Sequence, residues 1–481
     1  MAKNAQKKVL IVGSECAPFA KTGGLADVIG TLPKHLIALG LDTRVILPYH
    51  RIIKEKYGDL VEHLTDFTVQ LGWRSQYVGM EKLVYNDITY YLIDNEYYFG
   101  GPIYKGGEAE GEQYAFFTRA VMEAILKVDF CPDIIHCNDW QTGMLPFLLK
   151  TQYQHTKLQN TKTVFTIHNM MYQGKFSFGF VRDLLNVDSQ YNNSAYLEAY
   201  GCANFMKAAL VFADKINTVS PSYAEEIKLA YYAYGMEGIL NSRSKDLVGI
   251  VNGIDTEEFN PETDPLIKHH FSAADLSGKL ENKRALAEQM DLKFDPATTP
   301  VIGMVSRLTS QKGFDLIMRV FNEIMAENVA IVLLGSGDPS YESFFRGMEQ
   351  AYKGWVCSYI GYDNALAHQI YAASDLFLMP SKFEPCGISQ MISLRYGTLP
   401  IVRETGGLKD TVHPYNRFTG EGNGFTFTNY NAHDMLEVVR FALNTIQDEE
   451  ARSILLPRAM KEDNSFTLSA KKYYDLYCSL L

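Results

Sequence analysis

The sequence contains no long apolar segment. Its hydrophobic runs all fall short of the ~20 consecutive apolar residues that a membrane-spanning helix needs. Residues 1–8 are polar and basic, and the apolar stretch behind them is too short for a signal peptide. We therefore expect no leader or transit segment, no membrane partner and a cytoplasmic location.

Cysteine is scarce and scattered through the chain. The seven cysteines occur singly, without a Cys-x-x-Cys pair. An odd, dispersed set argues against a disulfide framework or a zinc site and fits a reducing compartment. The sequence also lacks His-Glu-x-x-His, an EF-hand loop, a nucleophile elbow and any Asp-x-Asp triplet. We therefore expect no bound metal and no cofactor, so basic side chains and helix dipoles would have to neutralise a leaving phosphate.

Positive charge is in short supply overall. The formal net charge is −11 over 481 residues, which disfavours nonspecific binding to nucleic acid or to anionic membranes. An anionic ligand would need a local basic pocket, so isolated lysines and arginines in glycine loops become stronger candidates for anion binding. A chain of this length is expected to form two or three domains.

Short apolar runs alternate with helical patterns along the chain, in two series. The first series of predicted strands is 9–13, 43–47, 88–93, 134–137, 163–167, 215–219 and 248–251. The second series is 301–305, 330–334, 355–360, 376–379, 399–402 and 424–427. Runs of this type with intervening helices indicate parallel sheets covered on both faces. The turn-rich segment 252–261 between the series suggests a connection between two α/β domains.

A paired-glycine loop follows the first strand. The stretch Lys21-Thr-Gly-Gly-Leu-Ala-Asp-Val28 leads into a helical pattern at 26–39. Gly23 and Gly24 have no Cβ where a ligand would meet backbone N–H groups, and the helix N-terminus favours an anion. Lys21 adds a full charge. The spacing matches neither the dinucleotide fingerprint nor the P-loop, so the loop is predicted to be an unclassified phosphate site.

The second series opens with a similar strand, loop and helix. Arg307 and Lys312 lie five residues apart in the loop before Gly313. Together they could hold a diphosphate, the arginine by a bidentate contact and the lysine as a point charge. Either residue alone would be read as a surface cation. The pair in an acidic protein favours the functional interpretation.

Two further strand ends carry polar residues. Glu384 precedes Pro385 on a loop before a helix expected near Gly387, where a carboxylate could accept hydrogen bonds from substrate hydroxyls. Taken alone, this loop could equally be a plain turn. His168 follows another strand, and a histidine in that position is more often structural than catalytic.

Taken together, the motifs resemble bacterial glycogen synthases and plant starch synthases in order and spacing. The motifs that carry the resemblance are Lys21–Val28, His136-Cys-Asn-Asp-Trp140, Thr166-Ile-His-Asn169, Asn252-Gly-Ile-Asp255, Ser306–Gly313, Ser381–Gln390 and Thr405-Gly-Gly-Leu-Lys-Asp410. They span nearly the whole chain. The resemblance implies a GT-B glycosyltransferase with two Rossmann-like, doubly wound domains that face an inter-domain cleft. It also implies metal-free transfer of glucose from ADP-glucose to the non-reducing end of an α-1,4-glucan, with retained configuration.

The resemblance implies a domain division and a role for each matching residue. The N-terminal, acceptor-side domain is expected at 1–253, the nucleotide-sugar domain at 254–459, and a helix that crosses back to the first domain at 460–481. Glu384, His168, Lys312 and Arg307 are expected to be catalytic: the two cations bind the diphosphate, while Glu384 holds glucose hydroxyls and His168 contacts the transferred glucose. Substrate binding is expected of Lys21, Gly23, Gly24, Asp27, Asp139, Asn252, Tyr362, Cys386 and Gly387, with Tyr362 near the adenine.

One departure and three alternatives remain at this stage. Many retaining GT-B enzymes carry a second glutamate seven residues after the first, but this sequence has Met391 there, which leaves ribose recognition by such a carboxylate in doubt. A UDP-glucose transferase of the sucrose synthase type is the runner-up. A non-catalytic glucan-binding protein would not need Lys21, Arg307, Lys312 and Glu384 together. A dinucleotide oxidoreductase would need the glycine fingerprint that is missing.

Overall fold

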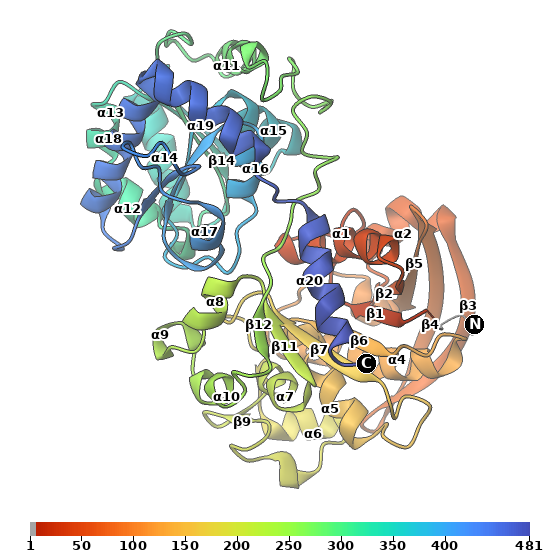
Figure 1. Ribbon diagram of the computed structural model, residues 1–481. Helices are drawn as coiled ribbons and strands as arrows, with labels where there is room; N and C mark the ends of the chain where they lie inside the picture. The colour runs from red at the N-terminus through yellow and green to blue at the C-terminus, as the bar shows by residue number, and fades with distance from the viewer. Residues whose placement is uncertain (1–5) are drawn as a thin grey trace. The chain divides into compact units, whose positions relative to one another are not determined.

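The computed structural model describes residues 6–481, which form two compact units. The first unit comprises the described residues up to Ile250 together with Phe466–Leu481, and the second is Val251–Ser465. In Figure 1 the first runs from red to yellow-green and includes the dark blue C-terminal helix, while the second runs from green to blue. Each unit is an α/β domain with its own sheet.

The sheet of the first unit has nine strands within the described residues, in the order β12-β11-β7-β6-β1-β2-β5-β4-β3. The strands are β1 (Lys8–Val12), β2 (Asp42–Pro48), β3 (Val61–Leu71), β4 (Arg74–Tyr85), β5 (Ile88–Asp94), β6 (Ile134–Asn138), β7 (Lys162–Ile167), β11 (Lys215–Thr218) and β12 (Leu247–Gly249). A small separate sheet has the order β8-β10-β9, with β8 (Lys175–Phe176), β9 (Glu198–Ala199) and β10 (Cys202–Asn204).

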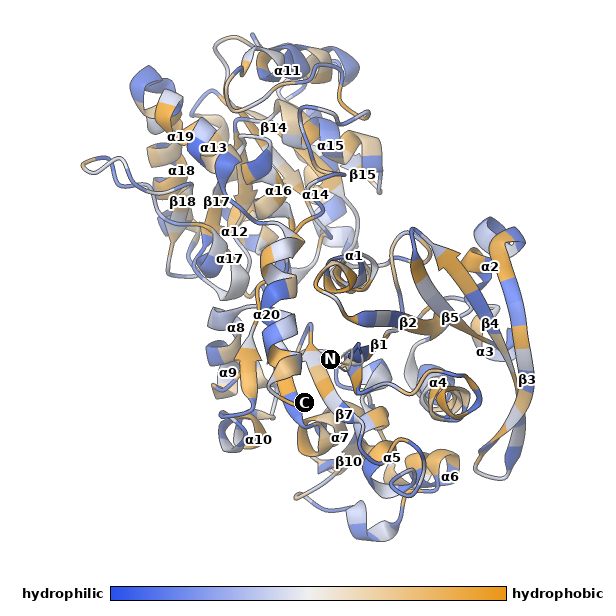
Figure 2. Ribbon diagram, turned by 45° about the vertical axis from the view of Figure 1, so that its right-hand side comes forward, coloured by the Kyte–Doolittle hydropathy of each residue, from blue (hydrophilic) through white to orange (hydrophobic). Residues whose placement is uncertain are grey.

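The predicted strands of this unit are all present, and they are parallel. Their apolar runs are buried because helices cover both faces of the sheet, as Val9–Val12 illustrate with at most 1% exposure. One edge of the sheet contains two strands that were not predicted, β3 and β4, which form an antiparallel hairpin beside β5. These two strands mix charged and apolar residues, because one side of the hairpin faces solvent. Figure 2 shows blue and orange residues interspersed along β3 at this edge.

Helices pack on both faces of this sheet. One hydrophobic cluster joins it to α4, α5 and α7, and a second joins it to α1 and the C-terminal helix α20. The helices of the unit are α1 (Gly24–Ala38), α2 (Arg51–Tyr57), α3 (Glu96–Phe99), α4 (Gly107–Lys127), α5 (Met144–Thr151), α6 (Phe178–Leu185), α7 (Phe205–Phe212), α8 (Pro221–Glu226), α9 (Ala230–Ala233), α10 (Glu237–Ser242) and α20 (Phe466–Cys478).

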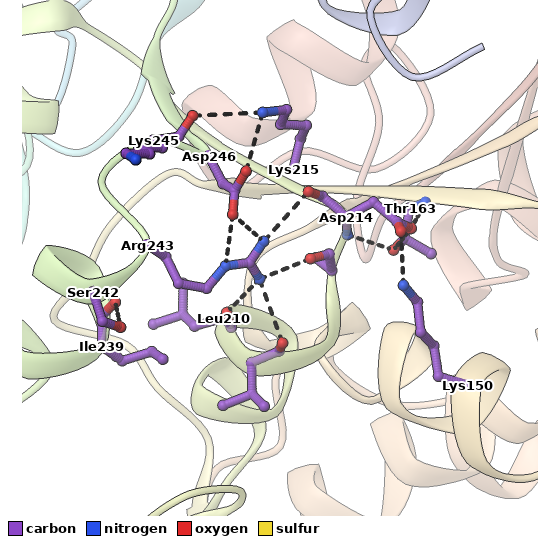
Figure 3. A network of polar contacts seen from close by, with 12 residues as sticks. Lys150, Thr163, Leu210, Asp214, Lys215, Ile239, Ser242, Arg243, Lys245 and Asp246 are labelled. Atoms are coloured by element: carbon purple, nitrogen blue, oxygen red, sulfur yellow. Dashed lines mark hydrogen bonds and ion pairs between the residues drawn. The ribbon is translucent and has the colours of Figure 1, made fainter.

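A polar network ties the end of α7 to the outer strands of the first unit (Figure 3). The Arg243 guanidinium donates to the carbonyls of Leu210 at 2.8 Å and Ala213 at 2.7 Å, where α7 ends, and to Asp246 at 2.9 Å. Nearby, Asp214 accepts from Lys150 at 2.7 Å. Carbonyls at a helix C-terminus have no hydrogen-bond partner inside the helix, and the guanidinium supplies one.

The second unit is built on a six-stranded parallel sheet in the order β15-β14-β13-β16-β17-β18. Its strands are β13 (Val301–Val305), β14 (Ala330–Gly335), β15 (Val356–Ile360), β16 (Leu376–Met379), β17 (Leu399–Arg403) and β18 (Phe425–Phe427). They confirm the second predicted series. The helices are α11 (Ser277–Gln289), α12 (Phe314–Arg319), α13 (Phe321–Met325), α14 (Pro339–Ala351), α15 (Asn364–Ala373), α16 (Ser389–Arg395), α17 (Gly406–Thr411), α18 (Ala432–Gln447) and α19 (Glu449–Lys461).

Both sheets have a point where the strand order reverses. In the first unit, β1 lies between β2 and β6; in the second, β13 lies between β14 and β16. The loops after such neighbouring strands turn to opposite faces and leave a crevice beyond the carboxyl ends, where ligands of open α/β sheets bind. The residues predicted to act on a ligand follow β1, β6 and β7 in the first unit. In the second unit they follow β13, β15 and β16, together with Asn252 at its start, just after β12.

Candidate active site

The paired-glycine loop follows β1 as predicted, and its cation is paired. Lys21 Nζ lies 2.6 Å from Asp27 Oδ1, and the two side chains are 45% and 28% exposed. Helix α1 begins at Gly24, with Gly23 in an extended conformation at its N-cap. Burial raises the pKa of Asp27, and Lys21 opposes that shift. Lys21 and Asp27 are thus held together at the start of a long helix.

Glu15, which was not predicted from the sequence, accepts hydrogen bonds from the residues of this loop. Its carboxylate is 2% exposed and accepts from the Thr22 backbone N–H at 2.5 Å and from the Thr22 hydroxyl at 2.7 Å. Burial raises the pKa of Glu15, and the bonds from Thr22 and the Gly23 amide work against that shift. The loop amides at 22 and 23 therefore already serve an internal carboxylate. An acidic residue three positions after the strand was the available signal.

Asp139 stands at the carboxyl end of β6 in a strained conformation. Its φ of 55° and ψ of 178° lie in a region that is nearly exclusive to glycine and costs roughly 1–3 kcal/mol. Its Oδ1 accepts the backbone N–H of His168 at 2.8 Å. Burial raises the pKa of Asp139 to about 7, although amide bonds from His168 and Asn169 oppose it. The neighbouring Glu15 carboxylate raises the pKa further.

His168 follows β7 and is brought next to Asp139, as the adjacent pairing of β6 and β7 requires. Its Nε2 lies 2.9 Å from the side-chain oxygen of Asn138. Burial lowers the pKa of His168 to about 3, so the imidazole is neutral near pH 7. Asn138 was quoted within a motif but was given no role from the sequence.

In the second unit, the loop after β13 meets the loop after β16. Lys312 Nζ lies 2.5 Å from Glu384 Oε2, with the side chains 16% and 7% exposed, and Ser381 donates to the same carboxylate oxygen at 3.2 Å. Gly313 has a φ of 76°, and a Cβ there would stand 2.0 Å from the Pro380 carbonyl oxygen. Glycine at 313 therefore lets the two loops touch, which places a cation beside a carboxylate.

The start of α17 supports the Glu384 loop from another side. Gly407 N–H donates to the Glu384 carbonyl at 3.1 Å. A Cβ on Gly406 would stand 1.9 Å from the same carbonyl oxygen, and one on Gly407 would stand 2.1 Å from the Cys386 carbonyl oxygen. The paired glycines of the Thr405–Asp410 motif thus act by close packing of backbone on backbone.

Asn252 and Cys386 also come together. Burial raises the pKa of the Cys386 thiol to about 12, and the nearby Asn252 backbone amide opposes that shift. The Asn252 side-chain oxygen is buried without a hydrogen-bond partner in the described residues. Gly387 has a φ of 75°, and helix α16 begins at Ser389, two residues later than expected.

The remaining predicted residues are exposed. Arg307 lies in the loop after β13. Tyr362 follows β15, is 71% exposed, and donates from its hydroxyl to Asn364 at 3.1 Å. The structure thus gathers Lys21 with Asp27, and Asp139 with His168, in the first unit. In the second it gathers Lys312 with Glu384.

Residues 6–481 contain no group of three or more histidine, cysteine, aspartate or glutamate side chains arranged to hold a metal ion. Over the same range, no helix combines the length and the apolar character needed to cross a bilayer. The seven cysteines are all free thiols.

Comparison with known proteins matches both units to glycosyltransferase families. Residues 8–242 match the family described as starch synthase catalytic domain, and residues 288–455 match glycosyl transferases group 1. The glycogen synthase of Geobacillus thermodenitrificans is 52% identical over 98% of both chains, and that of Clostridium perfringens is 49% identical over the same shares. The catalytic domain of starch synthase IV from Arabidopsis thaliana, solved bound to ADP and acarbose, superposes with a TM-score of 0.91 at 35% identity and covers 99% of both chains.

Identity near one half over the full length, a matching catalytic-domain family and the same two-domain architecture agree with the strand-end residues described above. The chain belongs to the glycogen synthase and starch synthase family of glucosyltransferases and has the GT-B fold.

Proposed function

We propose that the enzyme transfers glucose from ADP-glucose to the non-reducing 4-hydroxyl of an α-1,4-glucan, with retained configuration and release of ADP, in a reducing cytoplasm. The observation that carries this proposal is the contact between Lys312 and Glu384 at the switch point of the second sheet, where an ammonium lies 2.5 Å from a carboxylate. The cation suits a diphosphate. The carboxylate suits glucose hydroxyls and the positive charge that develops at the anomeric carbon.

The roles divide between the two units. In the proposed mechanism, Arg307 and Lys312 neutralise the diphosphate, Glu384 holds glucose hydroxyls, and Asn252, Cys386, Gly387 and Tyr362 place the donor. Lys21, the glycine loop, Asp27, Asp139 and His168 belong to the first unit and act on the phosphates, the transferred glucose and the acceptor end. Residues 1–253 would serve the acceptor and 254–459 the nucleotide sugar. The proposal therefore requires both units for one turnover.

Retention without an obvious nucleophile in the sequence favours front-face attack. The bond between C1 and the diphosphate oxygen breaks, the acceptor oxygen bonds C1 on the same face, and the acceptor proton passes to the departing phosphate to give ADP. In this step, basic side chains must stabilise the negative charge of the leaving diphosphate.

A Glu384→Gln variant tests the assignment. We expect kcat for incorporation of labelled glucose from ADP-glucose into glycogen to fall by roughly 10²–10³-fold, because the negative charge beside the anomeric carbon is lost. The matched control is Glu349→Gln, which removes another partly buried carboxylate of the same unit that accepts from Ser358 at 2.7 Å. Near-normal turnover in Glu384→Gln would contradict the catalytic role assigned to Glu384.

Donor choice is tested separately. We expect turnover with ADP-glucose to exceed turnover with UDP-glucose, with Tyr362→Ala raising KM for ADP-glucose because an exposed ring can stack on adenine. A preference for UDP-glucose would favour the sucrose synthase-like alternative instead.

A further inference from the structure

Asn138 ends β6 and is almost fully enclosed, with 1% of its surface exposed. Its side-chain nitrogen donates to the Val12 carbonyl at 3.1 Å and to the His136 carbonyl at 3.3 Å. An amide oxygen in that place would face two other oxygens, so the network fixes which end of the amide is which. The oxygen of Asn138 must therefore point the other way.

That oxygen lies 2.9 Å from His168 Nε2. A carbonyl oxygen only accepts, so Nε2 carries the hydrogen. The imidazole is neutral, because burial lowers the pKa of His168 to about 3. Its single proton is then committed to Asn138, and Nδ1 is an acceptor. In the part of the chain that the structure describes, Nδ1 has no hydrogen-bond partner of its own.

The charged and titratable neighbours agree with this assignment. Asp139 accepts the backbone N–H of His168 and does not bond its ring. His136 on β6 is also neutral, since burial lowers its pKa to about 3. Glu15 after β1 acts on Asp139. These neighbours supply the imidazole ring with no competing hydrogen-bond donor or acceptor.

We propose that Asn138 is a positioning residue that locks His168 in the Nε2–H tautomer, so that Nδ1 accepts a hydrogen bond from a hydroxyl of the transferred glucose. His168 in that state has no proton to give, which excludes it as the acid that protonates the departing phosphate. This inference rests on the proposed function, because it assumes that His168 contacts the donor sugar.

The tautomer can be read without any turnover. In protein labelled with ¹⁵N-histidine, the His168 signals are identified as those missing from His168→Gln. Two-bond correlations from the ring protons should report Nδ1 unprotonated and Nε2 protonated from pH 6 to pH 8. A protonated Nδ1 in that range would overturn the inference.

A double-mutant cycle tests the route of action. Asn138→Ala should lower kcat roughly ten-fold with a smaller change in KM, whereas in a His168→Ala background the same change should lower kcat less than about two-fold. Additive losses would mean that Asn138 acts on folding alone, and they would overturn the proposal. The control is Asn95→Ala, another buried asparagine of the unit that bonds two backbone groups, at Tyr77 and Tyr98. It should leave kcat within about two-fold.

Asn138→Asp supplies a readout that a purely structural residue would not move. A carboxylate beside Nε2 stabilises imidazolium and raises the pKa of His168. Because imidazolium has a hydrogen on Nδ1, kcat of this variant should fall as pH decreases through the raised pKa, in a range where the wild type is flat. An unshifted pH profile would contradict the proposal. If His168→Ala itself retained normal kcat, the proposed role of His168 would be wrong. The tautomer assignment would still be tested separately by the ¹⁵N spectrum.

Discussion

At the scale of single residues, the candidate site depends on charges held out of water. Asp139 combines a strained backbone, a partly buried carboxylate and an amide bond to His168. Glu15 is buried beneath the glycine loop, and Glu384 lies against Lys312. Burial raises the pKa values of Asp139 and Glu15, and groups whose pKa differs between the folded and unfolded chain make stability depend on pH.

Asp139 should make the protein less stable as pH rises. Its pKa of about 7 in the folded state is above its ordinary value of 3.8. Between those values the folded protein holds a proton that the unfolded chain has released, so the free energy of unfolding falls with pH, by up to about 1.4 kcal/mol per pH unit. Above pH 7 this contribution is constant.

Urea unfolding of the wild type and Asp139→Asn from pH 5 to pH 8 checks this prediction. Asparagine keeps an oxygen for the His168 amide and has nearly the same shape as aspartate, so the backbone strain is similar in both proteins, but it cannot ionise. The stability of the variant relative to the wild type should therefore increase between pH 5 and pH 7. Parallel curves for the two proteins would show that the carboxylate ionises as freely when folded as when unfolded.

Gly406 should resist substitution for a reason that only the fold reveals. A Cβ at this position would stand 1.9 Å from the Glu384 carbonyl oxygen, at a φ of 45°. Gly406→Ala should therefore lower the free energy of unfolding by at least ~3 kcal/mol and should also lower kcat, since Glu384 would shift. The control Gly420→Ala has a φ of 70° with no atom within 4 Å of the new Cβ, and it should cost only ~1 kcal/mol. Equal effects in the two variants would contradict the close-packing explanation.

At the scale of secondary-structure elements, α20 is attached to the first unit by polar bonds as well as by packing. The Tyr477 hydroxyl lies 2.8 Å from His136 Nδ1, and Asn217 donates to the Tyr473 hydroxyl at 3.2 Å. Both tyrosines are at most 1% exposed. The C-terminal helix therefore reaches the same buried polar layer, at β6 and β11, that lies behind His168.

Tyr477→Phe should lower the free energy of unfolding by about 1–3 kcal/mol, because it leaves His136 Nδ1 buried without a partner. Thermal unfolding measures this loss. Tyr474→Phe, the same change on a partly exposed ring of the same helix, should alter stability by less than about 0.5 kcal/mol. Equal losses would mean that the hydroxyl bond to His136 contributes nothing.

The strands that carry the site could be predicted because apolar runs such as 301–305 and 376–379 are buried on both faces. The β3–β4 hairpin could not, because its half-exposed strands lack such runs. Lys312 and Glu384 were both selected, but their contact depends on Gly313 fitting against Pro380, a tertiary fact. Glu15 was not predicted, because its role as acceptor for Thr22 depends on the loop folding back over it. Asn138 was not predicted, because its effect on the His168 tautomer depends on contacts among β1, β6 and the end of β7.

At the scale of the whole molecule, each unit carries its own set of charged candidate residues. The first offers Lys21 with several carboxylates, and the second offers Arg307, Lys312 and Glu384. In the proposed reaction, these cations neutralise the leaving diphosphate. EDTA in a turnover assay should then leave kcat unchanged within about two-fold, whereas Lys312→Met should reduce it by at least ~10²-fold. Loss of activity with the chelator, restored by added divalent cation, would contradict this division of labour.

The central claim is that the Lys312–Glu384 pair serves glucosyl transfer from ADP-glucose to a glucan. The most direct measurement is the incorporation of labelled glucose from ADP-glucose into glycogen by the wild type and by Glu384→Gln. The account predicts rapid incorporation by the wild type and a loss of roughly 10²–10³-fold in the variant, with Glu349→Gln unaffected. Incorporation at the same rate by the wild type and Glu384→Gln would contradict it.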